Sequence, residues 1–150
     1  MTATQHFKTL LSISLLAATS SFAQMTPVGS WHTIDDITGE AKAEIQIVEK
    51  EGVLNGRVIK SLRNDPNAKK ICDDCNDDRK GQVIIGMEII RGVKHEASNE
   101  PLWAGGGKIL DPENGKEYTV KMVPRDDGKK LQVRGYIGPF YRTQIWQRVQ

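Results

Sequence analysis

The strongest constraint on the fold is a strict two-residue alternation of polar and apolar residues in three segments. The alternation runs through residues 42–47, 117–122 and 131–137. A helix would need apolar spacings of three and four, so these segments are predicted to be β-strands with one buried face. The residues expected to face the core are Ala43, Ile45, Ile47, Val120, Met122, Leu131 and Val133.

Turns that contain glycine separate the alternating segments. Thr38-Gly39, Glu51-Gly52, the run 111–115 and Asp126-Asp127-Gly128 tolerate the positive φ of tight hairpins. We therefore expect strands near 30–35, 41–49, 53–62, 82–90, 106–110, 116–124, 129–137 and 142–149. Short antiparallel strands must protect their edges, so an all-β fold of about eight strands follows, and the sequential hairpins favour a closed meander barrel over a two-sheet sandwich.

Two stretches are less clear. Residues 82–90 are apolar almost throughout and could instead begin as a turn of helix, and residues 91–104 fit neither period. Gly105-Gly106-Gly107 lacks the following helix and the Lys-Ser/Thr pair of a phosphate loop, so a turn or bulge is expected there.

Length and composition narrow the class of protein. A chain of 150 residues with a net charge of +2 fits one domain and lacks the strong positive charge of a nucleic-acid binder. Its hydrophobic fraction of 38% is too low for a multi-span membrane protein. The sequence shows no motif of an activated nucleophile, and nothing singles out one pair of its many carboxylates as catalytic. No reaction is therefore indicated, and no cofactor is expected.

The first 23 residues are typical of a secretory signal peptide. His6 and Lys8 precede an apolar run at 10–18, and Ser21-Phe22-Ala23 has the small residues that signal peptidase reads. Cleavage is expected after Ala23, which leaves one domain at 24–150. The alternative is an N-terminal membrane anchor, which needs about 20 apolar residues, and the run at 10–18 is far shorter. The protein is therefore predicted to be periplasmic or secreted.

Cys72 and Cys75 lie in the long polar connection 63–81. In an exported chain, two cysteines this close are expected to form a structural disulfide. A redox pair is the second interpretation, although the neighbouring carboxylates disfavour a reactive thiolate.

Two metal-site hypotheses rest on the same connection. Zinc could be held by Cys72, Cys75, His32 and His95, although the histidines lack paired spacing. Asp74, Asn76 and Asp78 match three positions of a calcium loop. However, Arg79 replaces the required glycine and Ile85 the final glutamate, so a solvated acidic loop is the simpler interpretation.

Several strings together resemble one known family. They are Gly29-Ser30-Trp31, Cys72-Asp73-Asp74-Cys75, and the runs 103–109, 111–118, 131–138 and 142–149. In this order they resemble the exported bacterial family DUF2147 over residues 25–149. The resemblance implies a small lipocalin-like β-barrel in the periplasm, and no established reaction, ligand or catalytic residue. Phe140-Tyr141 departs from the family pattern, in which a longer turn with glycine is expected.

Aromatic residues are candidates for closing or lining the barrel. Trp31 and Arg148 resemble the Trp–Arg pair that closes one end of lipocalin barrels, where a guanidinium stacks on an indole. Trp103, Tyr136 and Trp146 could contact a ligand or a partner, or could belong to the core or rim.

Three functional hypotheses follow. The favoured one is a non-enzymatic barrel that binds a small, mostly apolar ligand. The alternative is an envelope protein-interaction module with a filled barrel and an outer patch of Trp103, Tyr136, Phe140 and Tyr141. The third is a redox- or metal-responsive factor that uses Cys72 and Cys75. Eight strands can enclose a ligand or be filled by their own side chains.

Overall fold

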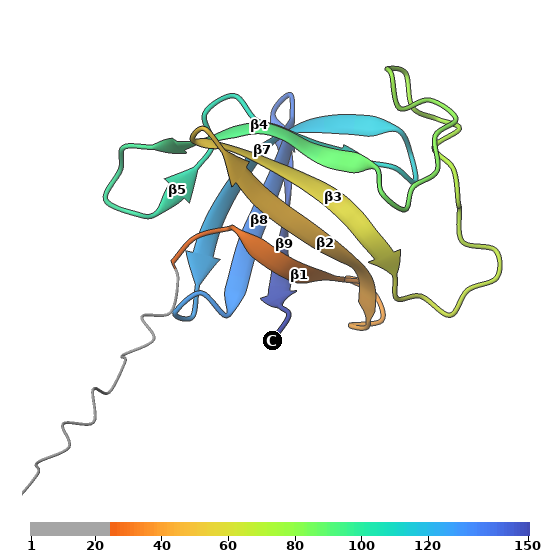
Figure 1. Cartoon of the computed structure of the whole chain (residues 1–150), viewed down its shortest axis with the longest axis horizontal. Coiled ribbons are helices and arrows are strands. Elements are labelled where there is room, and N and C mark those ends of the chain that lie inside the picture. Colours follow the sequence, from red (N-terminus) through yellow and green to blue (C-terminus); the bar gives the residue numbers. More distant parts are fainter. Residues whose placement is uncertain (1–24) are drawn as a thin grey trace, which may run out of the picture.

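The computed structural model describes residues 25–150, which fold into a β-barrel (Figure 1). The strands are β1 (Gly29–Ile34), β2 (Ala41–Lys50), β3 (Val53–Ser61), β4 (Glu88–Glu96), β5 (Leu102–Trp103), β6 (Lys108–Asp111), β7 (Lys116–Arg125), β8 (Lys130–Ile137) and β9 (Phe140–Arg148). This part of the chain has no helix, and hence none suited to crossing a membrane. The predicted signal peptide lies outside the described residues.

Neighbouring strands pair antiparallel in a closed ring. The order round the ring is β1, β2, β3, β4, β6, β7, β8 and β9, and the short β5 shares the place of β6 between β4 and β7. The ring closes because β3 pairs with β4 and β9 pairs with β1. Sequential hairpins that close in this way form a meander barrel with eight strand positions round the ring, as the sequence predicted.

The alternating faces meet in one core. All seven residues expected to point inward belong to the buried cluster or, for Ala43, pack against it. On β2, Ile45 and Ile47 are buried, whereas Gln46 and Val48 between and beyond them are exposed. Because burying an aliphatic side chain contributes about 1.5–3 kcal/mol, register shifts that expose this face are strongly disfavoured.

The expected strand at 82–90 is wrong in position. Residues 82–87 belong to the connection after β3, and β4 begins only at Glu88. There the backbone bonds irregularly: Ile84 N–H donates to Lys70, Gly86 N–H donates to Val58, and Gly86 has a φ of 89°. The segment is apolar because Met87 is buried and Ile84 packs against the core, which requires no regular strand and no helical turn.

The last hairpin is tighter than expected. Ile137 pairs with Phe140, so only Gly138 and Pro139 form the turn, and β9 starts two residues before the predicted 142. Phe140 and Tyr141 are therefore strand residues. A two-residue connection matches the twist of antiparallel strands, and Gly138 supplies the positive φ that such a turn uses.

The region 91–104 resolves into the end of β4 and the short β5. Between β5 and β6, Gly107 donates its N–H to the Ala104 carbonyl in a turn, as expected for the glycine triplet. A Cβ on Gly107 would lie 2.3 Å from Val93 Cγ2, so the chain crosses β4 too closely for any side chain.

Candidate functional site

The barrel encloses a cavity of about 540 Å³ that opens at one end. This volume lies within the roughly 300–1,000 Å³ of small-molecule sites. Its wall is largely aliphatic, with Ala43, Ile45, Val58, Ile89, Ile109 and Val133 among the lining residues. Thr33, Tyr118 and Gln144 add polar groups to the wall, and charged side chains line the cavity at its mouth. An apolar wall with polar groups at defined places is the usual composition of a site for a small organic molecule.

Trp31 and Arg148 lie at the opposite end of the barrel, near the β7–β8 turn. These residues face each other where β1 pairs with β9, and the Arg148 guanidinium lies 4.1 Å from the centroid of the Trp31 ring. Arg148 also donates to the carbonyls of Thr26, Val28 and Gly128. Burial lowers the pKa of Arg148. The guanidinium of Arg148 is thus stacked on the indole of Trp31 at this end of the barrel.

The open end carries a bridge of three charged side chains, Lys42, Arg63 and Glu113, which we call the rim bridge. Lys42 Nζ donates to Glu113 Oε2 at 2.7 Å, and Arg63 Nη1 donates to Glu113 Oε1 at 2.5 Å. Glu113 lies in the β6–β7 turn, while Lys42 lies on β2, across the ring from β7. The rim bridge therefore joins opposite walls of the mouth.

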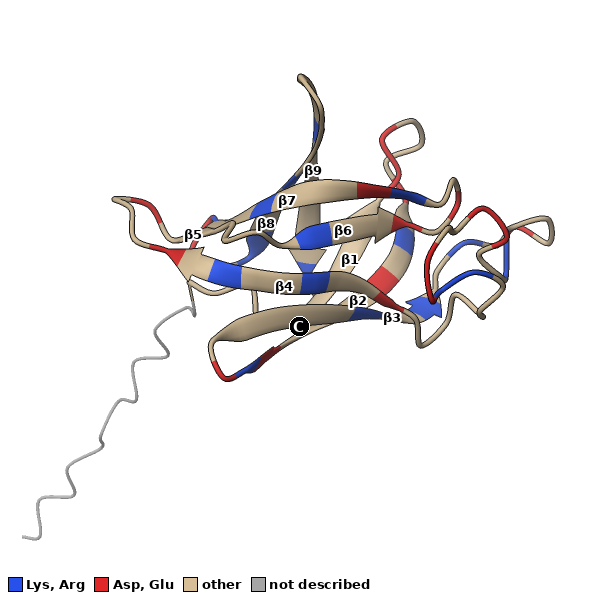
Figure 2. Cartoon of the chain, turned by 90° about the horizontal axis from the view of Figure 1, so that it is seen from above, with Lys and Arg blue, Asp and Glu red and all other residues tan. Residues whose placement is uncertain are grey.

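Further ion pairs surround the rim bridge. Arg63 Nη2 reaches Asp35 at 3.2 Å, and the pKa of Asp35 is lowered to about 2 by the amides of Thr38 and Ile37 together with Arg63. Arg142 on β9 pairs with Asp36. Figure 2 shows charged residues of both signs gathered at the end of the barrel from which the β3–β4 connection extends.

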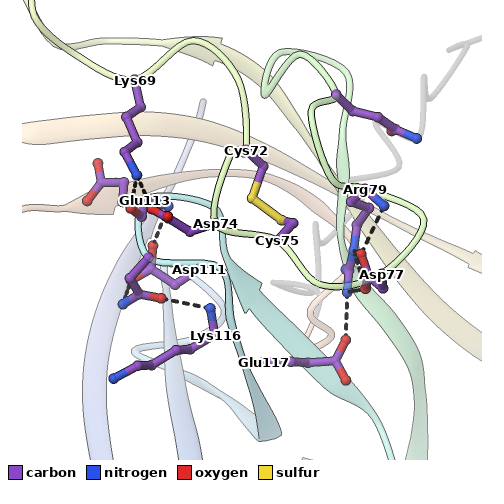
Figure 3. Close-up of a disulfide and its surroundings, with 12 residues drawn as sticks. Lys69, Cys72, Asp74, Cys75, Asp77, Arg79, Asp111, Glu113, Lys116 and Glu117 are labelled. Carbon is purple, nitrogen blue, oxygen red and sulfur yellow. Dashed lines mark hydrogen bonds and ion pairs between the residues drawn. A yellow bond between two sulfur atoms is a disulfide. The ribbon is translucent and has the colours of Figure 1, made fainter.

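The β3–β4 connection is held together by the Cys72–Cys75 disulfide (Figure 3). Both cysteines are 0% exposed and belong to the buried cluster. Lys69 pairs with Asp74 and donates to the Glu113 carbonyl at 2.9 Å, which ties the connection to the β6–β7 turn. The disulfide thus lies beside the mouth and stabilises a loop that contributes Arg63 and Lys69 to it.

Arg79 anchors the other side of this connection. It is only 1% exposed, and its guanidinium contacts Asp77, Glu117 on β7 and the Glu88 carbonyl (Figure 3). Burial opposes its charge, but the hydrogen bonds to Asp77 and Glu117 outweigh burial, so the pKa of Arg79 is raised. The hydrogen bond from Arg79 lowers the pKa of Asp77 to about 2.

The three aromatic candidates lie in different places. Trp146 lines the cavity, and its Nε1 donates to Gln144 at 3.1 Å. Trp103 is buried in the core opposite Met122, and its ring forms a T-shaped contact with the ring of His95. Tyr136 packs with Tyr141 and lies under the Lys121 ammonium. Only Trp146 of the three lines the cavity.

The proposed metal ligands are not brought together. Within residues 25–150 no group of three or more His, Cys, Asp or Glu side chains is arranged to hold a metal. Cys72 and Cys75 are bonded to each other, and His32 lies against Glu44. Asp74 and Asp78 each pair with a different cation, Lys69 and Arg91.

Sequence reasoning missed the charged residues of the mouth. Lys42 and Glu113 are 71 positions apart, and Arg63 and Glu113 are 50 apart, so no local pattern links them. The available signal was topological. In a meander barrel, residues at the start of β2, the end of β3 and the β6–β7 turn all lie at the same end, where Lys42, Arg63 and Glu113 meet.

Comparison with known proteins agrees with this architecture. The solved structure described as "Protein HP1028 from the human pathogen Helicobacter pylori belongs to the lipocalin family" has a TM-score of 0.68 and 18% identity, covering 85% of each chain. The fold is thus a lipocalin-like barrel. The family described as "Uncharacterized protein conserved in bacteria (DUF2147)" matches residues 29–148, and the chain belongs to it. No curated protein matches the sequence.

Proposed function

We propose that this protein is an exported, non-enzymatic barrel that binds a small, mostly apolar molecule. The observation that carries the proposal is the cavity of about 540 Å³ with its aliphatic wall. An eight-stranded barrel can be filled by its own side chains, in which case little more than a water would fit. The space here is instead of ligand size, and its mouth is lined by polar groups that could orient a ligand.

Export to the periplasm or the exterior is part of the proposal. Three observations support it: the signal-like composition of residues 1–23, the Cys72–Cys75 disulfide and a family described as bacterial. Disulfides persist in oxidising compartments and are rare in the cytosol. On this proposal the mature chain starts at Gln24 and forms a single domain.

A second candidate is an envelope interaction module. Phe140 and Tyr141 favour it, because they are 73% and 62% exposed on the β8–β9 hairpin. The outer patch would be smaller than the sequence suggested, since Trp103 packs in the core. The envelope-module hypothesis also assumes a barrel filled by its own side chains. The cavity instead favours ligand binding.

A redox role for Cys72 and Cys75 is the third candidate, and the surroundings of the disulfide favour a structural role. Reactive cysteines are partly exposed and lie in electropositive surroundings. Here both sulfur-bearing residues are buried, and the neighbouring Asp74 and Asp77 are carboxylates.

Native mass spectrometry of the protein purified from the periplasm tests the proposed function. We expect an adduct that disappears on denaturation. The mass of the protein itself should be that of a chain beginning at Gln24, less the two hydrogens that the reduced cysteines would carry. Ala43→Phe fills the cavity and should abolish the adduct. Gln46→Phe, on the exposed face of the same strand, should keep it. An adduct-free wild type that also fails to bind a neutral apolar probe would refute ligand binding.

A further inference from the structure

We propose that the ligand is an amphipathic carboxylate, and that Lys42 and Arg63 bind its head in the place that Glu113 occupies in this structure. This inference rests on the proposed function and adds the chemical class of the ligand. The apolar tail would lie along the aliphatic wall below the rim bridge, and the carboxylate would remain at the mouth.

The geometry of the rim bridge is that of a bound carboxylate. Each oxygen of Glu113 accepts from a different cation, Oε2 from Lys42 at 2.7 Å and Oε1 from Arg63 at 2.5 Å. The two cations thus form a preorganised two-point site for any carboxylate that reaches them. Hydrogen bonds between charged partners are the stronger kind, and their geometry adds specificity.

The place of this site in the barrel also fits a ligand head. Both Lys42 and Arg63 line the cavity, and their side chains are only 27% and 29% exposed. On β2, Ala43 and Ile45 follow Lys42 directly and belong to the apolar wall. A molecule that placed its carboxylate at Lys42 could therefore place its tail on aliphatic side chains without a gap.

Glu113 is suited to being displaced. It lies in the β6–β7 turn, and its side chain is 38% exposed, so it can turn outward into water. Moving its carboxylate away from the mouth releases Lys42 Nζ and Arg63 Nη1, while Arg63 Nη2 keeps its contact with Asp35. The two released donors then favour an anionic head.

Displacement would also open the mouth. The rim bridge connects β2 with the turn before β7, and these strands lie on opposite sides of the ring. While Glu113 holds both cations, the bridge crosses the route to the cavity. A ligand carboxylate that replaces Glu113 satisfies the same cations and removes this crossing in the same step.

The test compares two probes with the same tail and different heads, dodecanoate and dodecanol, on delipidated protein. Their dissociation constants are measured by displacement of a neutral fluorescent probe from the cavity. We expect dodecanoate to bind about tenfold more tightly, because two charge-assisted hydrogen bonds form only with the carboxylate. Equal affinities in the wild type would overturn this inference and leave the proposed function intact.

Three variants test the residues. The double change Lys42→Met with Arg63→Met should remove the preference for dodecanoate and leave dodecanol binding unchanged. Lys130→Met, which removes a cation paired with Asp126 at 2.7 Å far from the mouth, is the matched control and should keep the preference. Glu113→Gln should strengthen dodecanoate binding several-fold, because the neutral amide competes less well for both cations.

The Glu113→Gln variant tests the displacement of Glu113 even if the double variant does not fold. A dodecanoate affinity that stays the same or falls in Glu113→Gln, with dodecanol unchanged, would overturn the displacement. A preference that persists in a folded Lys42→Met, Arg63→Met protein would overturn the assigned residues. Binding of neither probe by the wild type would overturn ligand binding in this cavity, and this inference with it.

Discussion

At the residue scale, Arg79 organises the β3–β4 connection. A buried guanidinium is tolerated only where partners satisfy its donors, and here Asp77, Glu117 and the Glu88 carbonyl do so. Both carboxylates are 40% exposed, so the cation is buried while its partners stay in contact with water. The arrangement avoids the full cost of burying an ion pair and still fixes the loop against β7.

The lowered pKa of Asp77 predicts a specific sensitivity to acid. The pKa of Asp77 is 3.8 in the unfolded chain and about 2 in the folded protein, so the unfolded chain binds more protons between these pH values. Stability from this group is present above pH 4 and is lost as the pH falls toward 2. Asp77→Asn should lower stability at pH 7 and flatten its decline between pH 4 and pH 2, as measured by urea unfolding. Asp73→Asn, in the same loop, should leave the slope unchanged; equal slopes in all three proteins would contradict the assignment.

The disulfide belongs to the same scale. It closes a loop of only four residues, 72–75, so its removal should cost about 2 kcal/mol and leave the barrel folded. Cys72→Ala with Cys75→Ala should show this loss in urea unfolding and should retain the bound adduct. A double variant that loses ligand binding with unchanged stability would favour the redox interpretation instead.

At the element scale, the long connection is positioned by its contact with the β6–β7 turn. Asp74 approaches Gly115 so closely that an added Cβ would lie 2.0 Å from the Asp74 carbonyl oxygen. Gly115 also has a φ of 69°, which glycine adopts without strain. This close approach brings Lys69 to the Glu113 carbonyl and so helps to shape the mouth.

Two alanine substitutions separate the close approach from the effect of φ. Gly52→Ala, at a φ of 77° with open space around it, should cost about 1 kcal/mol from backbone strain alone. Gly115→Ala should cost about 1–3 kcal/mol more, because the loop must also move away. Urea unfolding gives both values. Equal losses would mean that the connection does not depend on this contact.

At the scale of the whole molecule, Arg148 supports the seam that closes the ring. The β1–β9 ladder has only two residue pairs, Trp31 with Arg148 and His32 with Gln147. Arg148 adds hydrogen bonds to the segment before β1 and to the turn between β7 and β8. One side chain therefore connects the two ends of the described chain with a third segment.

Replacing Arg148 should weaken the entire barrel. We expect Arg148→Met to lose about 2–4 kcal/mol, since the partly buried carbonyls of Thr26, Val28 and Gly128 lose their donor. Arg148→Lys should recover only part of the lost free energy of unfolding, because an ammonium cannot reproduce the forked hydrogen bonds of the guanidinium. Arg125→Met, at a side chain that is 41% exposed, should stay within about 0.5 kcal/mol. Similar losses at Arg125 and Arg148 would contradict a special role for the seam.

Much of the fold could be predicted because strand signals are local. The alternation in β2, β7 and β8 reports which face is buried, and Glu51-Gly52 and Asp126-Asp127-Gly128 mark the turns that join neighbours. The prediction failed at 82–90, where apolar residues pack against the core from an irregular connection. Composition alone does not distinguish that arrangement from a buried strand.

The sequence by itself determined most of the strands and the hairpins that join them, and it predicted the pairing of Cys72 with Cys75, because each depends on residues close together in the chain. Only the tertiary structure decided that the barrel is hollow and that Lys42, Arg63 and Glu113 meet at its mouth. A cavity depends on how side chains from opposite strands fill a shared volume. The rim bridge depends on ring closure, which brings together residues that are far apart in sequence.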